Sequence, residues 1–434
     1  MYKFLATILL SFSINHSFAQ NFSRFDQFID SLQVYNKFMG NITLRKNGEV
    51  LFEKSVGFGN ISTSEELSRD SKFRVASISK MFTAAIYFKT LELGKLNGNQ
   101  KLSEYFPSIP KSDLITIDNL LNHRSGIYNY TTDEKILNYK TEPQTSEFLI
   151  NRIIEGGSQF IPGSDAWYSN SNFLLLTFIL EKTNGKSLQQ QIREWITEPL
   201  EMTNTSLPGS NEHPEVNSYS YFTNWKITNP SDPSVLLGAG AIVSTTEDLA
   251  KFVEGLFNEK LIEKKSLYKM ISIEDGFGRG IFSFLFDEHI IFGHTGGIDG
   301  FQSSISYFPE IGLLVCMLSN GMNYNYTEIT DAMISSYWGD EIVIPNLKPI
   351  IISVEQLEKY VGEYRSNEIS LELSFTLEDG LIIAYPSGYE SAALSPKGNH
   401  TFEFNAVNAK ITFSPEKGKM QLNQGGETFM FTRR

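Results

Sequence analysis

A single cysteine, Cys316, is present among the 434 residues of the chain, so the protein forms no internal disulfide and depends on its apolar cores for stability. The chain has only six histidines, and none is spaced like the ligands of a metal site. It contains no long run of lysine or arginine, and its formal net charge is −13. We therefore expect no metal or other cofactor, and neither nucleic acid nor an anionic membrane surface as a partner.

The apolar segment 4–12 is too short to cross a bilayer, which argues against an N-terminal membrane anchor. Lys3 precedes this segment, and Ser17-Phe18-Ala19 follows it. A positive start, an apolar stretch and a small-x-small cleavage site are typical of a secretory signal. Residues 1–19 are therefore predicted to be a signal peptide. The protein is expected to be exported, either periplasmic or secreted, with no membrane span in the mature chain.

A Ser-x-x-Lys motif at residues 77–80 lies where a strand-like run ending at Ala76 gives way to a helical run from Met81 to Leu93. Ser77 is thus predicted in the first turn of a helix, with Lys80 one turn later on the same face. The free N–H groups and positive dipole end of a helix can stabilise an oxyanion, and a neutral lysine there can accept the serine proton. This position is suited to a nucleophilic serine.

The Ser-x-x-Lys pattern alone has little specificity, because the chain contains it four times, starting at Ser77, Ser108, Ser266 and Ser414. Only the first copy opens a long apolar helix. A helix-capping serine followed by a solvated lysine is the commoner role of such a pair. The interpretation of Ser77 therefore depends on other motifs along the chain.

The first 340 residues predict a sheet divided between two distant parts of the chain. Residues 25–38 read as an amphipathic helix, and residues 40–54 as a hairpin around the turn Asn47-Gly48. Strands return at 302–308 and 312–319, followed by a helix at 326–338. The residues between these parts are mainly helical. We expect an α/β domain over residues 20–345.

Residues 344–353 read as a linker, and the tail from 353 to 434 alternates short strands with Gly, Asn and Pro turns. This pattern predicts a small all-β barrel or sandwich. The tail has no cluster of His, Cys or Ser/His/Asp residues, so it is expected to be separable from any chemistry.

Two further motifs, Tyr168-x-Asn170 and His294-Thr295-Gly296, occur once each. Taken singly, Tyr168 can be a half-buried aromatic residue, Asn170 a helix cap, and the glycines after His294 a strand bulge. In this order after Ser77-x-x-Lys80, the motifs resemble the serine β-lactamase and penicillin-binding-protein superfamily. The resemblance covers roughly residues 30–340 and is greatest to the branch of class C β-lactamases, DD-peptidases, D-aminopeptidases and carboxylesterases.

The resemblance implies a β-lactamase/transpeptidase-like fold, in which helices flank an antiparallel sheet and form a helical subdomain. The tail resembles the lipocalin-like β domains that some members carry. The resemblance to this superfamily also implies the catalytic roles. Ser77 would be acylated, Lys80 would help deprotonate it and hold Tyr168, and Tyr168 would shuttle protons. With an ordinary pKa near 10, Tyr168 is expected to need nearby positive charge to form a phenolate. His294 would lie in the catalytic site, at the position where many members have a lysine.

The resemblance assigns substrate binding to four further positions. Asn170 would hydrogen-bond the substrate amide, and Thr295 would bind a substrate carboxylate or carbonyl. The glycines Gly296 and Gly297 would let the backbone approach the substrate, and the N–H groups of Gly297 and Ser77 would form the oxyanion hole.

Two departures bear on the activity. Ser-Asp-Asn is absent, which argues against the class A branch. His294 in place of lysine removes a permanent charge, which fits peptidase or esterase members better than a dedicated β-lactamase. We therefore expect an exported serine hydrolase that cleaves an amide or ester through an acyl-enzyme, on D-amino-acid-containing peptides or small esters. A true class C-type β-lactamase and a non-catalytic penicillin-binding or sensor protein remain alternatives.

Overall fold

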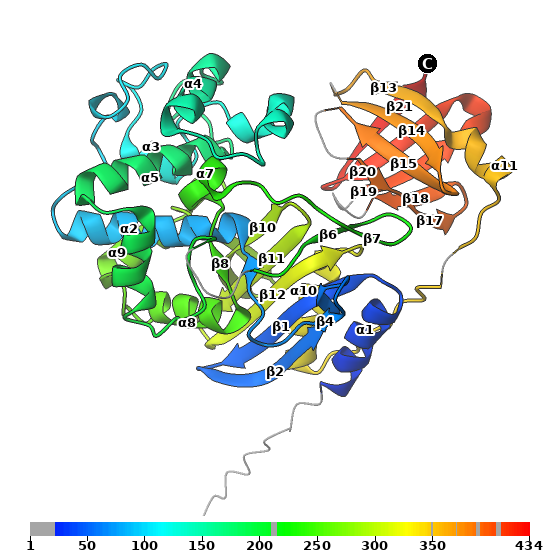
Figure 1. The fold of residues 1–434 in the computed structure, drawn as a ribbon, viewed down its shortest axis with the longest axis horizontal. Coiled ribbons are helices and arrows are strands. Elements are labelled where there is room, and N and C mark those ends of the chain that lie inside the picture. Colours follow the sequence, from blue (N-terminus) through cyan, green and yellow to red (C-terminus); the bar gives the residue numbers. More distant parts are fainter. Residues whose placement is uncertain (1–21, 210–214, 349, 370, 388–390, 405–408) are drawn as a thin grey trace, which may run out of the picture.

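The computed structural model describes residues 22–209, 215–348, 350–369, 371–387, 391–404 and 409–434. The predicted signal peptide, residues 1–19, lies outside these ranges. The described residues form a mixed α/β body followed by a β barrel, and an extended segment joins the two (Figure 1).

An antiparallel sheet lies at the centre of the α/β body, with strand order β2-β1-β12-β11-β10-β9. Its strands are β1 (Phe38–Lys46), β2 (Glu49–Val56), β9 (Phe282–Phe286), β10 (His289–Ile298), β11 (Phe301–Phe308) and β12 (Leu313–Met322). Strand β1 pairs with β12 from Phe38↔Met322 to Lys46↔Leu313. The sheet therefore joins two distant parts of the chain, as predicted. The short hairpin of β6 (Tyr219–Tyr221) and β7 (Trp225–Ile227) extends the sheet beside β12.

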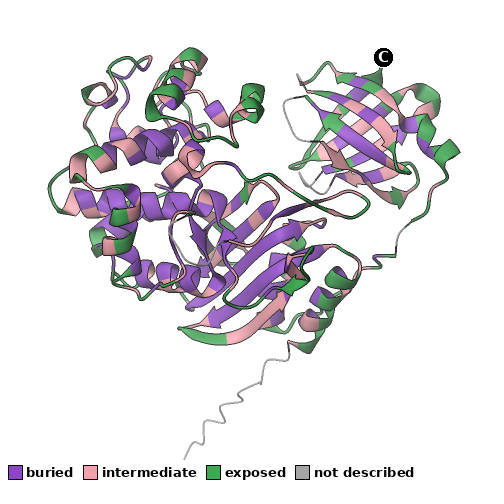
Figure 2. Ribbon diagram, in the orientation of Figure 1, coloured by how far each residue is buried: buried purple, intermediate pink, exposed green. Residues whose placement is uncertain are grey.

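Helices cover both faces of this sheet, because alternate side chains of a strand point to opposite faces. Leu314, Cys316 and Leu318 of β12 enter the larger core, while Leu313 and Val315 enter the smaller one. The smaller core is covered by α1 (Ser23–Val34) and α10 (Tyr326–Trp338), and the larger by α2 (Ser79–Glu92), α5 (Asn170–Asn184) and α8 (Thr246–Phe257). Figure 2 shows the central strands β1 and β12 and helices α2 and α5 as largely buried, whereas the outer strand β2 is more exposed.

The first predicted helix, 25–38, is too long. Helix α1 ends at Val34, and Phe38 already begins β1 with its ring in the core. Asn36, with a φ of 54°, takes the left-handed conformation that ends the helix and turns the chain.

Shorter elements complete the helical region beside α2 and α5. They are α3 (Ile117–Leu121), α4 (Ser146–Gly156), α6 (Leu188–Ile192), α7 (Pro233–Leu236) and α9 (Lys264–Ile271). Two short strand pairs are formed by β3 (Phe58–Asn60) with β4 (Glu65–Glu66) and by β5 (Phe73–Arg74) with β8 (Val243–Ser244). Figure 1 shows β4 beside β1 and α1. The predicted antiparallel sheet with flanking helices and a helical subdomain is thus confirmed.

The described part of the tail forms a nearly closed nine-stranded β barrel after a short helix, α11 (Val354–Leu357). The strands are β13 (Gly362–Ser366), β14 (Glu372–Glu378), β15 (Leu381–Pro386), β16 (Ala392–Ala393), β17 (Ser395–Gly398), β18 (Thr401–Phe404), β19 (Ala409–Ser414), β20 (Lys419–Gln424) and β21 (Glu427–Arg433). The strand order begins with β16 and ends with β17, which are consecutive in the chain. One chain segment therefore forms both edges and nearly closes the barrel around its own core.

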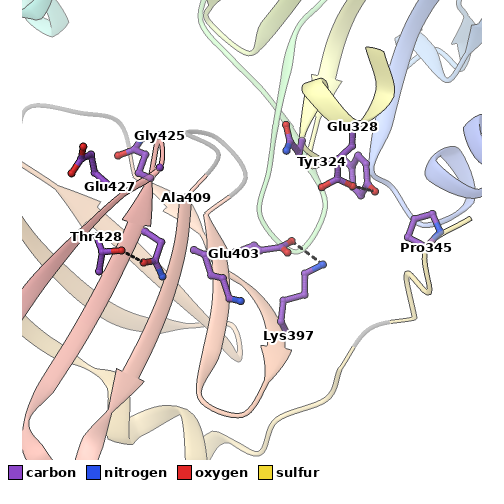
Figure 3. Close-up of a pocket in the computed structure, with 14 residues that line it drawn as sticks. Tyr324, Glu328, Pro345, Lys397, Glu403, Ala409, Gly425, Glu427 and Thr428 are labelled. Atoms are coloured by element: carbon purple, nitrogen blue, oxygen red, sulfur yellow. Dashed lines mark hydrogen bonds and ion pairs between the residues drawn. The ribbon is translucent and has the colours of Figure 1, made fainter. Parts of the chain in front are cut away.

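A polar cavity of about 490 Å³ lies where the barrel meets the start of α10 (Figure 3). Tyr324 and Glu328 line it from the α/β body, and Lys397 and Glu403 line it from the barrel, where they form an ion pair at 2.8 Å. The cavity between the two bodies is therefore lined mainly by polar and charged residues.

Candidate active site

Ser77 lies on a short 3-10 turn, Ala76–Ile78, that leads directly into α2. The preceding residue, Ala76, has a φ of 46°, a left-handed conformation that costs a non-glycine residue roughly 1–3 kcal/mol. Flanking hydrogen bonds hold this turn in place: the Val75 N–H donates to the Ile242 carbonyl at 2.9 Å, and the Ser303 hydroxyl donates to the Val75 carbonyl at 2.8 Å. The position of Ser77 is thus fixed by the segment just before β8 and by strand β11.

The Ser77 hydroxyl lies between Lys80 and Tyr168. Lys80 Nζ is 3.1 Å from Ser77 Oγ, and the Tyr168 hydroxyl donates to the same Oγ at 2.8 Å. Lys80 Nζ also donates to Asn170 Oδ1 at 2.7 Å and to the Ala239 carbonyl at 2.6 Å. The structure therefore brings together the three residues on which the resemblance to serine hydrolases rests.

Burial sets the protonation of this cluster. It lowers the pKa of Lys80 well below its ordinary value of 10.5. A neutral lysine has two N–H groups, enough for Asn170 and Ala239, and its lone pair is then available to the Ser77 hydroxyl. Lys80 is thus poised to accept the Ser77 proton.

Burial also raises the pKa of Tyr168 above 10, and the hydrogen bond with Ser77 opposes this only in part. In the free site Tyr168 is therefore a hydroxyl donor, and the expectation that it needs nearby positive charge to form a phenolate stays a prediction. The His123 ring lies beneath it, at a centroid distance of 4.5 Å. His123 Nδ1 accepts from the Ser169 N–H at 3.2 Å, which fixes the backbone next to Tyr168.

Asn170 is the first residue of α5, and its side chain is held from two directions. Besides accepting from Lys80, it donates from Nδ2 to Thr131 Oγ1 at 2.8 Å. Its backbone N–H donates to Asn129 Oδ1 at 3.0 Å. Asn170 therefore positions Lys80, and its predicted contact with a substrate amide stays a prediction.

His294 lies on β10 with only 2% of its surface exposed, and its ring packs on Phe282 at a centroid distance of 4.7 Å. Its Nδ1 is 2.6 Å from the Thr295 carbonyl oxygen, which can only accept, so Nδ1 carries the proton. Burial is the main cause that lowers the pKa of His294, to about 3. The side chain is therefore neutral at physiological pH.

The glycines that follow on β10 differ in how closely they approach Ser77. A Cβ on Gly296 would lie 2.8 Å from the Ser77 backbone nitrogen and 2.6 Å from the Val75 carbonyl oxygen, whereas on Gly297 its nearest neighbour would be the flexible end of Gln302 at 3.3 Å. Only glycine at position 296 lets β10 pack this closely against the Ser77 turn.

A cavity of about 260 Å³ opens at Ser77. The residues that line it are Ser77, Tyr168, Phe282, His294, Thr295, Gly296, Gly297, Gln302 and Tyr326. The sequence motifs do not predict Phe282, Gln302 and Tyr326, because none of these residues belongs to a motif. Gln302 was detectable in principle, since β11 pairs it with Gly297 across a two-residue turn.

The described side chains include no group of three or more His, Cys, Asp or Glu residues that is placed to hold a metal ion. In the same part of the chain, no helix has both the length and the apolar character needed to cross a membrane.

Comparison with known families decides the classification. The family described as Beta-lactamase matches residues 27–334, well over half of the chain. This chain belongs to the Beta-lactamase family. Membership of the Beta-lactamase family makes it a serine hydrolase of the β-lactamase type, and it confirms the resemblance seen in the motifs.

Two bacterial relatives show how far the similarity extends. Penicillin-binding protein 4* of Bacillus subtilis (strain 168) is 24% identical over 425 residues, which covers 89% of this chain and 92% of that protein. Protein flp of Staphylococcus aureus (strain N315) is 27% identical over 303 residues, covering 66% of this chain and 60% of that protein. The chain thus spans nearly the whole of the first relative but less than two thirds of the second.

Solved structures of the Beta-lactamase fold also match. The octameric penicillin-binding protein homologue from Pyrococcus abyssi has a TM-score of 0.66 at 20% identity and covers 95% of this chain and 100% of its own. The D-stereospecific amidohydrolase from Streptomyces sp. has a TM-score of 0.64 at 23% identity, covering 74% and 100%. The D-amino acid amidase from Ochrobactrum anthropi SV3, complexed with L-phenylalanine amide, has a TM-score of 0.63 at 22% identity. The match covers 72% of this chain and 99% of that protein. At these identities the likeness establishes the fold.

Proposed function

We propose that this protein is an exported serine hydrolase that cleaves an amide or ester through an acyl-enzyme on Ser77, with D-amino-acid amides and peptides or small esters as substrates. One observation carries the proposal: Ser77 Oγ contacts both Lys80 Nζ, at 3.1 Å, and the Tyr168 hydroxyl, at 2.8 Å. The reacting groups belong to the domain predicted over residues 20–345. Export rests on the predicted signal at residues 1–19.

Acylation begins with transfer of the Ser77 proton to the lone pair of neutral Lys80 as Oγ attacks the substrate carbonyl carbon. The backbone N–H groups of Ser77 and Gly297 stabilise the oxyanion. When the tetrahedral intermediate collapses, the bond to the leaving group breaks, and the leaving nitrogen or oxygen takes the Tyr168 proton. This step leaves Ser77 as an ester, Lys80 as an ammonium and Tyr168 as a phenolate.

Deacylation restores the three groups. The Tyr168 phenolate takes a proton from water, and the hydroxide attacks the acyl carbonyl carbon. The bond to Ser77 Oγ then breaks, and Oγ recovers its proton from the Lys80 ammonium. Lys80 Nζ lies 4.8 Å from the centroid of the Tyr168 ring, so its positive charge stabilises the phenolate in the acyl-enzyme.

The absence of cationic side chains from the cleft supports, as substrates, amides and esters that have no carboxylate next to the scissile bond. None of the described residues that line the Ser77 cavity is a lysine or an arginine. The neutral His294 stands where many members have a lysine. A carboxylate on the leaving group therefore has no cationic partner along the described walls, which disfavours β-lactams and peptides that end in a free carboxylate. The amide-cleaving proteins among the structural neighbours fit this preference.

A substrate panel on the purified protein and on Ser77→Ala tests the proposal. It contains a p-nitrophenyl ester, a D-aminoacyl p-nitroanilide, a D-Ala-D-Ala peptide and a chromogenic cephalosporin. We expect the ester and the anilide to be turned over fastest, and Ser77→Ala to lose turnover of both. Fastest turnover of the cephalosporin would instead identify a true β-lactamase. Stoichiometric acylation by penicillin, with no turnover of any substrate, would identify a sensor protein.

A further inference from the structure

A second and larger cavity, of about 540 Å³, adjoins the cleft at Ser77. Gly297 and Gln302 line both cavities, so the two share a wall. Asn170, whose Oδ1 accepts from Lys80 Nζ at 2.7 Å, and Thr131 also line the larger cavity. Its volume lies in the range of about 300–1,000 Å³ that small-molecule sites occupy. A substrate bound at Ser77 can therefore extend into it.

The position of Tyr168 indicates which part of a substrate enters the larger cavity. In the proposed function, on which this inference rests, Tyr168 gives its proton to the leaving group. Tyr168 lines the smaller cavity and not the larger one, whereas Asn170 lines the larger one. The leaving group therefore lies in the smaller cavity, and the acyl group extends past Gly297 into the larger.

The β barrel forms part of the wall of this larger cavity. Ser391, Ala392, Ala393 and Phe404 line it from the barrel, and Tyr221 and Phe222 line it from the α/β body. Ala392 packs against the barrel core, whereas its neighbour Ala393 is not part of that core. Because successive residues of a strand point to opposite sides, Ala393 faces away from the barrel interior, toward the cavity. Figure 1 shows the β6–β7 hairpin extending toward the barrel on this side.

The charges along the cavity are largely paired within the protein. Lys140 Nζ lies 3.2 Å from Asp299 Oδ1, and Asp133 forms an ion pair with Arg152. Glu134 lines the cavity as an exposed carboxylate. Among the described lining residues, the one lysine is thus neutralised by its partner. An acyl group with no negative charge matches this lining.

We propose that the barrel, through Ala393, forms the outer wall of the acyl pocket and sets the largest acyl group without negative charge that the enzyme accepts. The tail then supplies no reacting group but determines substrate range. This differs from the expectation that the tail is separable from the site.

The test uses full-length protein and p-nitrophenyl esters of straight-chain acids from acetate to dodecanoate. Ala393→Phe should lower kcat/KM for the long esters at least about tenfold and leave that for acetate within about twofold. Thr432→Phe is the matched control, because it adds similar bulk to an exposed position of β21 elsewhere on the barrel. It should change neither value. Ala393→Val, a smaller addition, should give a weaker loss with the same dependence on chain length.

Three results would overturn the inference. One is an unchanged ratio of long-ester to acetate activity in both Ala393 variants. Another is an equal loss for all chain lengths in both variants, with thermal unfolding used to compare their folding. The third is selective loss on acetate esters with larger alcohol groups, which would assign the cavity to the leaving group. If the wild-type protein hydrolyses no ester and is not acylated at Ser77, the proposed function fails instead.

Discussion

The amide oxygen of Asn170 lies 2.7 Å from Lys80 Nζ, so a residue predicted to bind substrate also holds the base of the reaction. Asn170 is in turn fixed by Thr131 and Asn129. Because an amide is uncharged, this contact orients Lys80 without stabilising its ammonium form as a carboxylate would. Asn170 thus lets burial keep the pKa of Lys80 low.

Replacing Asn170 with aspartate should shift the pH dependence of the reaction to higher pH. A carboxylate this close favours the ammonium form and raises the pKa of Lys80. The neutral amine is populated only above that pKa, so kcat/KM at pH 7 should fall at least about tenfold and recover at higher pH. Asn170→Ala is the control, and it should lower the rate without raising the pKa of Lys80. A kcat/KM profile with the wild-type midpoint in Asn170→Asp would contradict this account of Lys80.

The two glycines of β10 should respond differently to alanine. In Gly296→Ala, the new Cβ would overlap the Ser77 nitrogen and the Val75 oxygen, both backbone atoms, so β10 must move away from the Ser77 turn. A displacement of about 1 Å costs roughly 100-fold in rate, and we expect at least that loss in kcat. Gly297→Ala meets only the mobile end of Gln302, keeps its N–H, and should retain activity within about tenfold. Equal losses in the two variants, with equal thermal stability, would count against this packing.

His294→Lys should change both the pH profile and the choice of substrate. Since the pKa of His294 is about 3, this residue should contribute no step to the wild-type profile between about pH 5 and 9. An added ammonium group would lower the pKa of Lys80 further and favour the Tyr168 phenolate, moving the acid limb of kcat/KM to lower pH. It would also offer a partner to a substrate carboxylate.

The measurement compares a D-Ala-D-Ala peptide with a D-aminoacyl p-nitroanilide in wild type, His294→Lys and His294→Ala. The ratio of kcat/KM for the peptide to that for the anilide should rise in His294→Lys alone. His294→Ala should lose activity without a shift of its kcat/KM–pH profile. If rates and profiles are the same in all three proteins, His294 lies outside the working site.

The sequence was sufficient for the elements that depend on local pattern. The turn Asn47-Gly48 predicted the β1–β2 hairpin, and the strands expected at 302–308 and 312–319 are β11 and β12. Three short motifs in a fixed order indicated the family, although more than 200 residues separate Ser77 from His294. Each motif lies where a helix begins or a strand passes Ser77, and such positions leave a local signature of small and polar residues.

Features that depend on long-range packing could not be predicted from the sequence. Burial, not sequence spacing, lowers the pKa of Lys80 and raises that of Tyr168. Phe282 and Tyr326 reach the cleft only because β9 and α10 lie beside β10 and β12, and neither carries a motif. The same holds for Ala393, whose place in the cavity wall depends on how the barrel meets the α/β body.

The most direct test of the central claim is the location of the covalent adduct after reaction with a fluorophosphonate. Trypsin cleavage after Arg74 and Lys80 releases residues 75–80, which contain both Ser77 and the buried Ser79. We expect fragmentation of this peptide to place one adduct on Ser77, in wild type and in Ser79→Ala, and no labelling in Ser77→Ala. An adduct on Ser79 or on any other residue, or full labelling of Ser77→Ala, would contradict the assignment of Ser77 as the nucleophile.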